Sequence, residues 1–356
     1  MRPSFSHAPH DRTRPIKRRV VPFLAVALLL CISAVIIWSR NRRSSDFLQV
    51  ALAEKHQRPK LQSKSGTTID STTGSKNNQL LVITPLGNST SNEKGVHALK
   101  CSMKFRGHNP EHLIRAKFDD KDGYGGLDVK KIRTILRTLQ ELLSQQEWPA
   151  TTLILVVDAF DVVIQADPQE ILQAYDAQPY PILFGAEAGC WNPVTKTLQS
   201  TVSAPLCTLP THQTSIAKGL YLNSGVFLST LGTLAAFLDH ELNHQELPTE
   251  KEGLVALQGF PGQFNDQAYW GYWYTKYHPL IGIDNTGDNN NKLIIANIGR
   301  DHRSALRFDT TTGLFALEDN NNGKQKQVPP VMHFPGSHPK LFKPYIAAKR
   351  FFEENC

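Results

Sequence analysis

Two aspartates interrupt an apolar stretch, LILVVDAFDVVI, at residues 153–164. Burying an unpaired carboxylate costs several kcal/mol, so Asp158 and Asp161 are not expected to be buried without partners. Two carboxylates at this spacing, on a turn after a strand, can reach one hard cation, with water and a phosphate completing its shell. A diphosphate is then the natural partner. The alternative is that Asp161 caps the next turn and Asp158 accepts a loop hydrogen bond.

Composition and charge limit the class of protein. The chain has 356 residues, 40% of them hydrophobic, which suffices for one large folded domain or two ordinary ones. The net charge of +7 is uneven, because residues 1–43 carry nine Lys and Arg against one Asp. The rest of the chain is close to neutral. A basic nucleic-acid-binding surface is therefore disfavoured for the main domain, and we expect no nucleic-acid partner.

An uncharged apolar segment covers residues 20–38. As a helix it would measure roughly 28 Å, close to the hydrocarbon thickness of a bilayer. A cleaved signal peptide is the alternative, but the segment is longer than a usual signal core and ends in WSRNRR rather than at a small-residue cleavage site. Six cations precede it and three follow, which predicts a single-pass type II anchor in the lipid bilayer. The tail, residues 1–19, is then cytosolic.

The remaining chain divides into a stem and a folded domain. Residues 39–78 are polar and read as a flexible stem, and the folded domain is expected over residues 79–356. Outside the membrane segment, the cysteines are Cys101, Cys190, Cys207 and Cys356. In an oxidising lumen we expect Cys190 and Cys207, which bracket a Pro-containing loop, to form a disulfide; two free thiols are the alternative. Their spacing does not favour a structural zinc site.

Strand-like and helix-like patterns alternate along the domain. Strands are expected at residues 80–84, 152–158, 181–187, 220–229 and 330–334, and helices through residues 127–143 and from Pro168 onward. This alternation predicts an α/β sandwich with a mostly parallel sheet. Ligands of such sheets bind beyond the carboxyl ends of the strands, where Asp158 is expected.

Five motifs, in order and spacing, resemble the glycosyltransferase domain of the procollagen lysyl hydroxylase family over nearly all of residues 79–345: ILVVDAFDVVI, FGAEAGCW, YLNSGVFLS, FNDQAYW and VMHFPGSHPK. The resemblance implies a GT-A nucleotide-sugar transferase fold, with a Rossmann-like, mostly parallel sheet flanked by helices. It also implies a UDP-sugar donor and a bound Mn²⁺, for which Mg²⁺ could substitute. The reaction would then be the retaining transfer of a hexose in the Golgi or endoplasmic reticulum.

The resemblance also implies which residues hold the metal and the diphosphate. The metal ligands are Asp158, Asp161 and His333, with His338 as a competitor of His333. For the donor it suggests Lys131 or its neighbour Lys130, and Phe160 in place of a family tyrosine, with Thr84 as a further candidate. Asn223, Ser224 and Gly225 are candidates from their own chemistry, because glycine lets a backbone approach a ligand closely and asparagine can bond sugar hydroxyls; a tight turn is the equal alternative. The departing diphosphate gains charge that a divalent ion and a lysine stabilise. Taken alone, His333 is better explained as a half-buried strand-end histidine bonded to a backbone carbonyl.

Sugar contacts are less specific. In the family an acidic residue at Asp266 faces the donor sugar and the acceptor, although Asp266 could simply cap a helix. Glu187, at another strand end, is a second candidate for binding sugar hydroxyls. The aromatic run at residues 269–277 is expected to be mainly core, with Trp270 or Trp191 as a stacking platform. The Asn88 glycosylation sequon must turn outward or stay unused.

Two other classes of protein remain open. A lumenal metal-dependent phosphoesterase would also use aspartates and a histidine, but it needs a second metal cluster or a nucleophile motif. A membrane-tethered carbohydrate-binding module without catalysis would keep the aromatics and need not keep the acids and Lys131. For a transferase, the acceptor is a protein or a glycan, with collagen hydroxylysine suggested by the family.

The first prediction concerns topology. Protease added to sealed microsomes should spare residues 44–356 and trim only the cytosolic tail, because the membrane segment places the domain in the lumen. Immunoblotting with antibodies to each end measures this. Digestion of the main domain in intact vesicles would overturn the type II assignment, and detergent-opened vesicles are the control.

Overall fold

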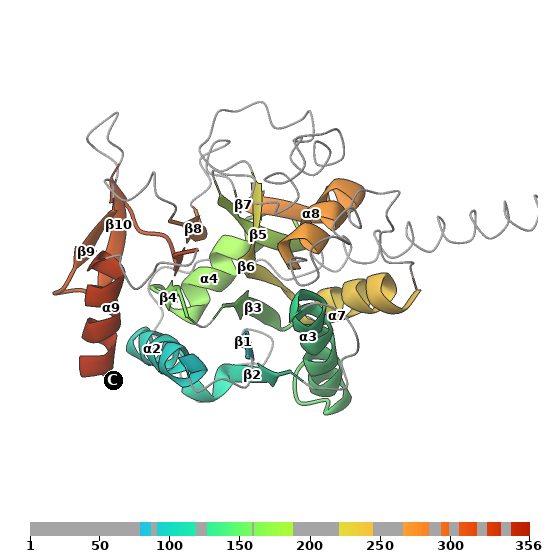
Figure 1. Ribbon diagram of the computed structural model, residues 1–356, viewed down its shortest axis with the longest axis horizontal. Helices are drawn as coiled ribbons and strands as arrows, with labels where there is room; N and C mark the ends of the chain where they lie inside the picture. The colour runs from blue at the N-terminus through green and yellow to red at the C-terminus, as the bar shows by residue number, and fades with distance from the viewer. Residues whose placement is uncertain are drawn as a thin grey trace, which may run out of the picture. The chain divides into compact units, whose positions relative to one another are not determined.

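The computed structural model describes residues 79–86, 91–118, 127–158, 160–187, 221–244, 266–284, 293–298, 306–318, 326–335 and 343–356 (Figure 1). All of them lie in one compact unit, Ala51–Cys356. Outside them lie the expected tail, membrane segment and stem, together with Asn88, Cys190, Trp191, Cys207 and His338. No helix in the described part of the chain has the length and apolarity needed to cross a bilayer.

Within the described residues, nine strands form one sheet in the order β2-β1-β3-β6-β5-β8-β12-β4, with β7 paired to β5. The bounds are β1 Leu80–Leu86, β2 Leu113–Lys117, β3 Leu153–Val157, β4 Val162–Ile164, β5 Ile182–Glu187, β6 Tyr221–Thr230, β7 Ile281–Asp284, β8 Ile295–Asn297 and β12 Val331–His333. All five expected strands are therefore present.

The direction of the strands corrects one expectation. Most strand pairs of the expected mostly parallel sheet are parallel, but β6 runs antiparallel to both β3 and β5, and β4 runs antiparallel to β12, so the sheet is mixed. Residues 223–225 consequently lie in the first half of β6 and not at a strand end. Because β6 is antiparallel, its first half still lies beside the carboxyl ends of β3 and β5.

Helices cover both faces of this sheet. Their bounds are α2 Ser91–Phe105, η2 Pro110–His112, α3 Leu127–Ser144, α4 Pro168–Asp176, α7 Leu231–Asp239, η3 His240–His244, α8 Asp266–Tyr277 and α9 Lys343–Glu354. The expected helices at residues 127–143 and from Pro168 are α3 and α4, and the Asp167 carboxylate caps α4 by accepting the Glu170 N–H at 2.8 Å. In β1, Leu80 and Val82 pack with α2 and α4 on one face. Alternation along the strand turns their neighbours to the other face, where α3 packs against α7 (Figure 1).

The aromatic run on α8 is core, as expected, but Trp270 is not a sugar platform. Its side chain is fully buried and lies against Phe184, Phe227 and Phe237, with ring centroids 4.8, 5.1 and 5.9 Å away. A ring enclosed by three other rings has no face left for a sugar. Expecting Trp270 to stack on a ligand was therefore wrong.

A second core joins the end of the chain to the sheet. The small sheet contains β9 Leu306–Asp309, β10 Leu314–Glu318 and β11 Lys326–Gln327. Phe315 from this sheet, Met332 from β12 and Phe352 from α9 belong to one buried cluster. A disulfide joins Cys101 on α2 to Cys356, which is 255 residues away in sequence. In Figure 1, α9 lies between α2 and the β9–β10 hairpin.

The second prediction concerns this cross-link. Because it closes a long loop, its removal by Cys101→Ser with Cys356→Ser should lower the free energy of unfolding by about 2–4 kcal/mol. Denaturant titration measures the change. A tryptic map without reduction should show the 101–356 pair, and also a linked 190–207 pair. Equal stability of the variant and the wild type would contradict a structural role, and free Cys190 and Cys207 would contradict the second bond.

Candidate active site

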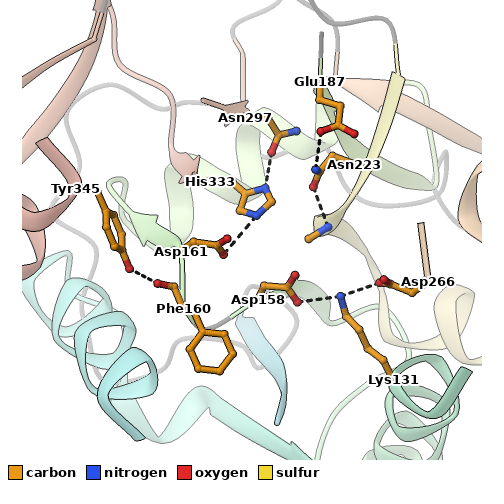
Figure 2. Close-up of polar contacts among 11 residues, drawn as sticks. Lys131, Asp158, Phe160, Asp161, Glu187, Asn223, Asp266, Asn297, His333 and Tyr345 are labelled. Carbon is orange, nitrogen blue, oxygen red and sulfur yellow. Dashed lines mark hydrogen bonds and ion pairs between the residues drawn. The ribbon is translucent and has the colours of Figure 1, made fainter. Parts of the chain in front are cut away.

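Polar side chains from several strands meet at one edge of the main sheet (Figure 2). Asp158 follows β3, Glu187 ends β5, Asn297 ends β8 and His333 ends β12. Strands β5, β8 and β12 are parallel neighbours, so the ends of these three strands meet at the same edge. This is the edge at which sheets of this class bind ligands.

His333 lies at the centre of this edge and is almost fully buried. Its Nδ1 is 2.6 Å from Oδ1 of Asn297, and its Nε2 is 3.4 Å from Oδ1 of Asp161. The ring packs directly over the Gly225 backbone, where a Cβ atom would lie 2.6 Å from Nε2. His333 therefore presents Nε2 to Asp161, as Figure 2 shows.

Asp161 is held by the backbone just after β12. Its carbonyl accepts the Phe334 N–H at 2.8 Å, which places its side chain beside His333. Oδ1 of Asp161 is buried and accepts no hydrogen bond within the described residues. A buried carboxylate oxygen without a donor is costly unless a cation or proton completes it. The structure thus brings together two of the three predicted metal ligands.

Asp158, the third predicted ligand, has a different partner in this structure. Its carboxylate lies 2.9 Å from Nζ of Lys131, and the same ammonium lies 2.7 Å from Asp266. Burial alone lowers the pKa of Lys131, but the two carboxylates outweigh burial and the pKa is raised overall, so the ammonium stays charged. The backbone of Asp158 is fixed by its N–H, which donates to the Gly225 carbonyl at 2.8 Å. Lys131, rather than Lys130, is therefore the lysine of the site.

The predicted sugar contacts form a second group. Asn223 donates from Nδ2 to Glu187 at 3.1 Å and accepts the Gly225 N–H at 2.9 Å. Gln267, on α8, donates to the other oxygen of Glu187 at 2.5 Å. Burial raises the pKa of Glu187, and the hydrogen bonds from Asn223 and Gln267 act against that rise. Asn223 thus orients Glu187 and the β6 backbone.

Three other predicted donor contacts lie at the same edge. Phe160, between the two aspartates, is 42% exposed, and its carbonyl accepts a hydrogen bond from the Tyr345 hydroxyl on α9. Thr84, in β1, is buried, and its Oγ1 has no hydrogen-bond partner within the described residues. Ser224 is buried in β6. Only the Phe160 ring is therefore presented openly to a planar ligand.

The donor atoms at Asp161 and His333 suit a divalent cation. Their 3.4 Å separation is close to the distance of roughly 3 Å between neighbouring ligands at about 2.1 Å from an octahedral ion. Oxygen and imidazole nitrogen together suit a divalent transition metal. The predicted ligands do not yet form a group of three. Among the described residues, ligand atoms of three His, Cys, Asp or Glu side chains lie within 4.8 Å of one another only at His97, Cys101 and Cys356. Asp158 would have to turn from Lys131 to join Asp161 and His333.

Sequence reasoning missed three residues that position this site: Gln267, Asn297 and Tyr345. Gln267 directly follows Asp266 at the start of α8, so its closeness to a predicted site residue could have marked it as a candidate. Asn297 ends a short strand that the pattern did not reveal. Tyr345 belongs to a helix near the end of the chain, and nothing local links it to Phe160.

Residues 76–247 match the family model of the PLOD GT domain. The expected resemblance to the glycosyltransferase domain of the procollagen lysyl hydroxylase family is confirmed over this range, and the chain carries a glycosyltransferase domain. The matched range includes Lys131, Asp158, Asp161, Glu187 and Asn223. The other site residues, from Asp266 to Tyr345, are placed by the structure. A glycosyltransferase takes a sugar donor and an acceptor, and those of this class use a nucleotide-sugar donor and often a divalent metal.

Several solved structures are similar in fold. Mouse xyloside xylosyltransferase 1 has 12% identity and a TM-score of 0.38, covering 72% of this chain and 97% of that one. A glycosyltransferase involved in glycosylation of the major capsid of PBCV-1 has 9% identity and a TM-score of 0.33, covering 77% and 98%. The bifunctional glycosyltransferase WbbM has 12% identity and a TM-score of 0.34, covering 78% and 51%. No curated protein matches the chain by sequence. The class of protein therefore rests on the family match.

The third prediction tests the close approach at Gly225. An alanine there would place Cβ 2.4 Å from Cε1 of His333, so Gly225→Ala should push the ring away and lower stability by about 1–3 kcal/mol. The matched control is Gly271→Ala in α8, where nothing lies within 4 Å, and it should raise stability by about 0.5–1 kcal/mol. Thermal unfolding compares the two. Equal effects would show that the ring does not need the glycine.

Proposed function

We propose that this protein is a GT-A glycosyltransferase that moves a hexose, glucose or galactose, from a UDP-sugar to a protein or glycan acceptor. The reaction is Mn²⁺-dependent and retains the anomeric configuration. The protein is a type II membrane protein of the Golgi or endoplasmic reticulum, with its catalytic domain in the lumen and residues 20–38 in the bilayer. Collagen-type hydroxylysine is the proposed acceptor class. Support comes from the family match over residues 76–247.

One observation carries the proposal. Within the matched DAFD stretch, a buried oxygen of Asp161 has no hydrogen-bond donor among the described residues and faces Nε2 of His333. Asp161 and His333, with Asp158, are the residues that would hold the ion. When bound, a divalent ion supplies positive charge that stabilises a departing diphosphate.

Lys131 has a role of its own in this reaction. Its ammonium is held by Asp266 as well as by Asp158, so Asp266 keeps it in place when Asp158 turns to the ion. A fixed, permanently charged group needs little reorganisation when negative charge develops beside it. Lys131 therefore stabilises the leaving diphosphate, and Asp266, held by the same ammonium, faces the sugar.

Glu187 serves the sugar end of the site. Both of its oxygens accept hydrogen bonds from amide groups, which leaves lone pairs for sugar hydroxyl groups. Phe160, with its exposed ring, serves the nucleotide end. The two ends are separated by the acids and Lys131, in the order that a nucleotide, diphosphate and sugar require.

Incubation with a panel of UDP-sugars tests the reaction. A transferase releases UDP in a Mn²⁺-dependent manner, and mass spectrometry then finds the hexose on lumenal proteins of cells that contain this chain. Release of UMP and sugar phosphate would instead indicate a metal-dependent phosphoesterase. Binding without any release would indicate a carbohydrate-binding module.

The fourth prediction concerns the metal ligands. Asp161→Asn should lower the rate of UDP release by about two orders of magnitude or more, because each 1.4 kcal/mol of lost stabilisation is about tenfold. Its thermal midpoint should stay near that of the wild type or rise, since the buried oxygen gains no donor in the folded protein. His333→Ala should be partly rescued by excess Mn²⁺, because water can replace one ligand.

A matched control is Glu111→Gln, which changes a surface carboxylate whose 3.8 Å ion pair with Lys100 is worth little. It should leave both the rate and the thermal midpoint unchanged. An Asp161→Asn protein that unfolds, or that keeps wild-type turnover, would mean that Asp161 is structural.

A further inference from the structure

Asn297 bonds to His333 on the side of the ring opposite to Asp161. Strands β8 and β12 are parallel and pair Asn297 directly with His333. Oδ1 of Asn297 lies 2.6 Å from Nδ1 of the ring, and both side chains are buried (Figure 2). The backbones are joined as well, because the Ile298 N–H donates to the His333 carbonyl at 2.7 Å. The position of the Asn297 side chain relative to the His333 ring is therefore fixed by both the backbones and the side-chain contact.

The orientation of the Asn297 amide follows from its other partner. Nδ2 lies 2.9 Å from the Ala186 carbonyl oxygen, which can only accept a hydrogen bond. The amide nitrogen must face Ala186, so the amide oxygen faces His333. An oxygen that only accepts requires a donor at Nδ1 of the ring. A neutral His333 thus carries its proton on Nδ1 and its lone pair on Nε2.

That lone pair points at Asp161. Nε2 and the buried Oδ1 of Asp161 are 3.4 Å apart, and in this tautomer both atoms are acceptors. Two acceptors facing each other in a buried place gain nothing from one another, but both can bind one cation. The opposite tautomer would place a hydrogen on Nε2 and remove its metal-binding lone pair.

Asn297 is itself held on several sides. The buried Asp284 carboxylate at the end of β7 accepts the N–H groups of Ile294 and Ile295, each at 2.7 Å, and so fixes the start of β8. Gly185 in β5 makes room for the amide, since a Cβ there would lie 2.6 Å from Nδ2. Strands β5, β7 and β8 therefore all contribute to the position of one side chain.

We propose that Asn297 is a positioning residue that sets the tautomer and orientation of His333 and so determines the affinity of the Asp161–His333 site for a divalent cation. This inference rests on the proposed function in taking that site to hold a metal. Partners that orient a metal-binding histidine in this way typically change metal affinity by about 10- to 100-fold when they are removed.

The two halves of the amide allow a direct test in the full-length protein. Asn297→Ala removes both hydrogen bonds and should weaken Mn²⁺ binding by about 10- to 100-fold in a calorimetric titration. Asn297→Asp keeps an acceptor for Nδ1 but loses the donor to Ala186. It should lower the thermal midpoint as much as Asn297→Ala, yet bind Mn²⁺ within a few-fold of the wild type.

Gln165→Ala is the matched control. This buried amide also bridges two backbone groups, donating to the Pro329 carbonyl at 2.7 Å and accepting the Phe315 N–H. The side-chain hydrogen bonds of Gln165 to described residues go to Pro329 and Phe315 and not to His333, so its loss should lower the thermal midpoint and leave Mn²⁺ affinity unchanged. Nitrogen-15 NMR of the metal-free protein gives a second readout, in which the His333 ring of the wild type should show the Nδ1–H form.

Each outcome decides the proposal. Wild-type Mn²⁺ affinity in Asn297→Ala, or an Nε2–H ring in the wild type, overturns it. Should Asn297→Ala not fold, the Asn297→Asp titration and the NMR measurement still decide, because loss of Mn²⁺ affinity in Asn297→Asp would also contradict it. If the wild type binds no Mn²⁺, the proposed metal site is wrong, while the ring tautomer separately reports whether Asn297 positions His333.

Discussion

The site depends on the close approach of three chain segments at Gly225. Its carbonyl accepts the Asp158 N–H, its own N–H donates to Asn223, and its Cα faces the His333 ring. No side chain could occupy this point without moving the histidine. The antiparallel course of β6 makes the approach happen, because it brings the first half of that strand beside the end of β3. The Gly225 backbone therefore contacts all three groups: the loop with the two aspartates, the amide of Asn223 and the ring of His333.

Most of the acids at this edge have a partner within the protein. Asp158 and Asp266 share the Lys131 ammonium, and Glu187 is held by two amides. Asp161 differs from the other acids, because among the residues that the structure describes its buried oxygen has only the histidine opposite. The site thus contains one charge pair that is already complete and one pair of ligand atoms that is not. That contrast explains why a cation is expected beside Asp161.

Residues near the C-terminal end of the described chain, in β12 and α9, contact the site. β12 enters the sheet between β8 and β4, and α9 places the Tyr345 hydroxyl on the Phe160 carbonyl. The disulfide from Cys101 to Cys356 ties the end of α9 to α2. His333 therefore reaches the aspartates through contacts that span most of the domain, which is a long-range arrangement rather than a local motif.

The sequence by itself determined the elements and the types of residue that carry chemistry. Apolar runs marked β1, β3, β5, β6 and β12, periodic leucines and isoleucines marked α3, and the order of the motifs indicated a glycosyltransferase domain, because these signals are local. Only the tertiary structure decided that β6 is antiparallel, that Trp270 is enclosed in the core, that Asp158 pairs with Lys131, and that Asn297 orients His333. Strand direction and side-chain partners depend on residues far apart in the chain, and their free energies arise only when the segments pack together. A pattern read along one segment contains no information about the partner that the fold will bring to it.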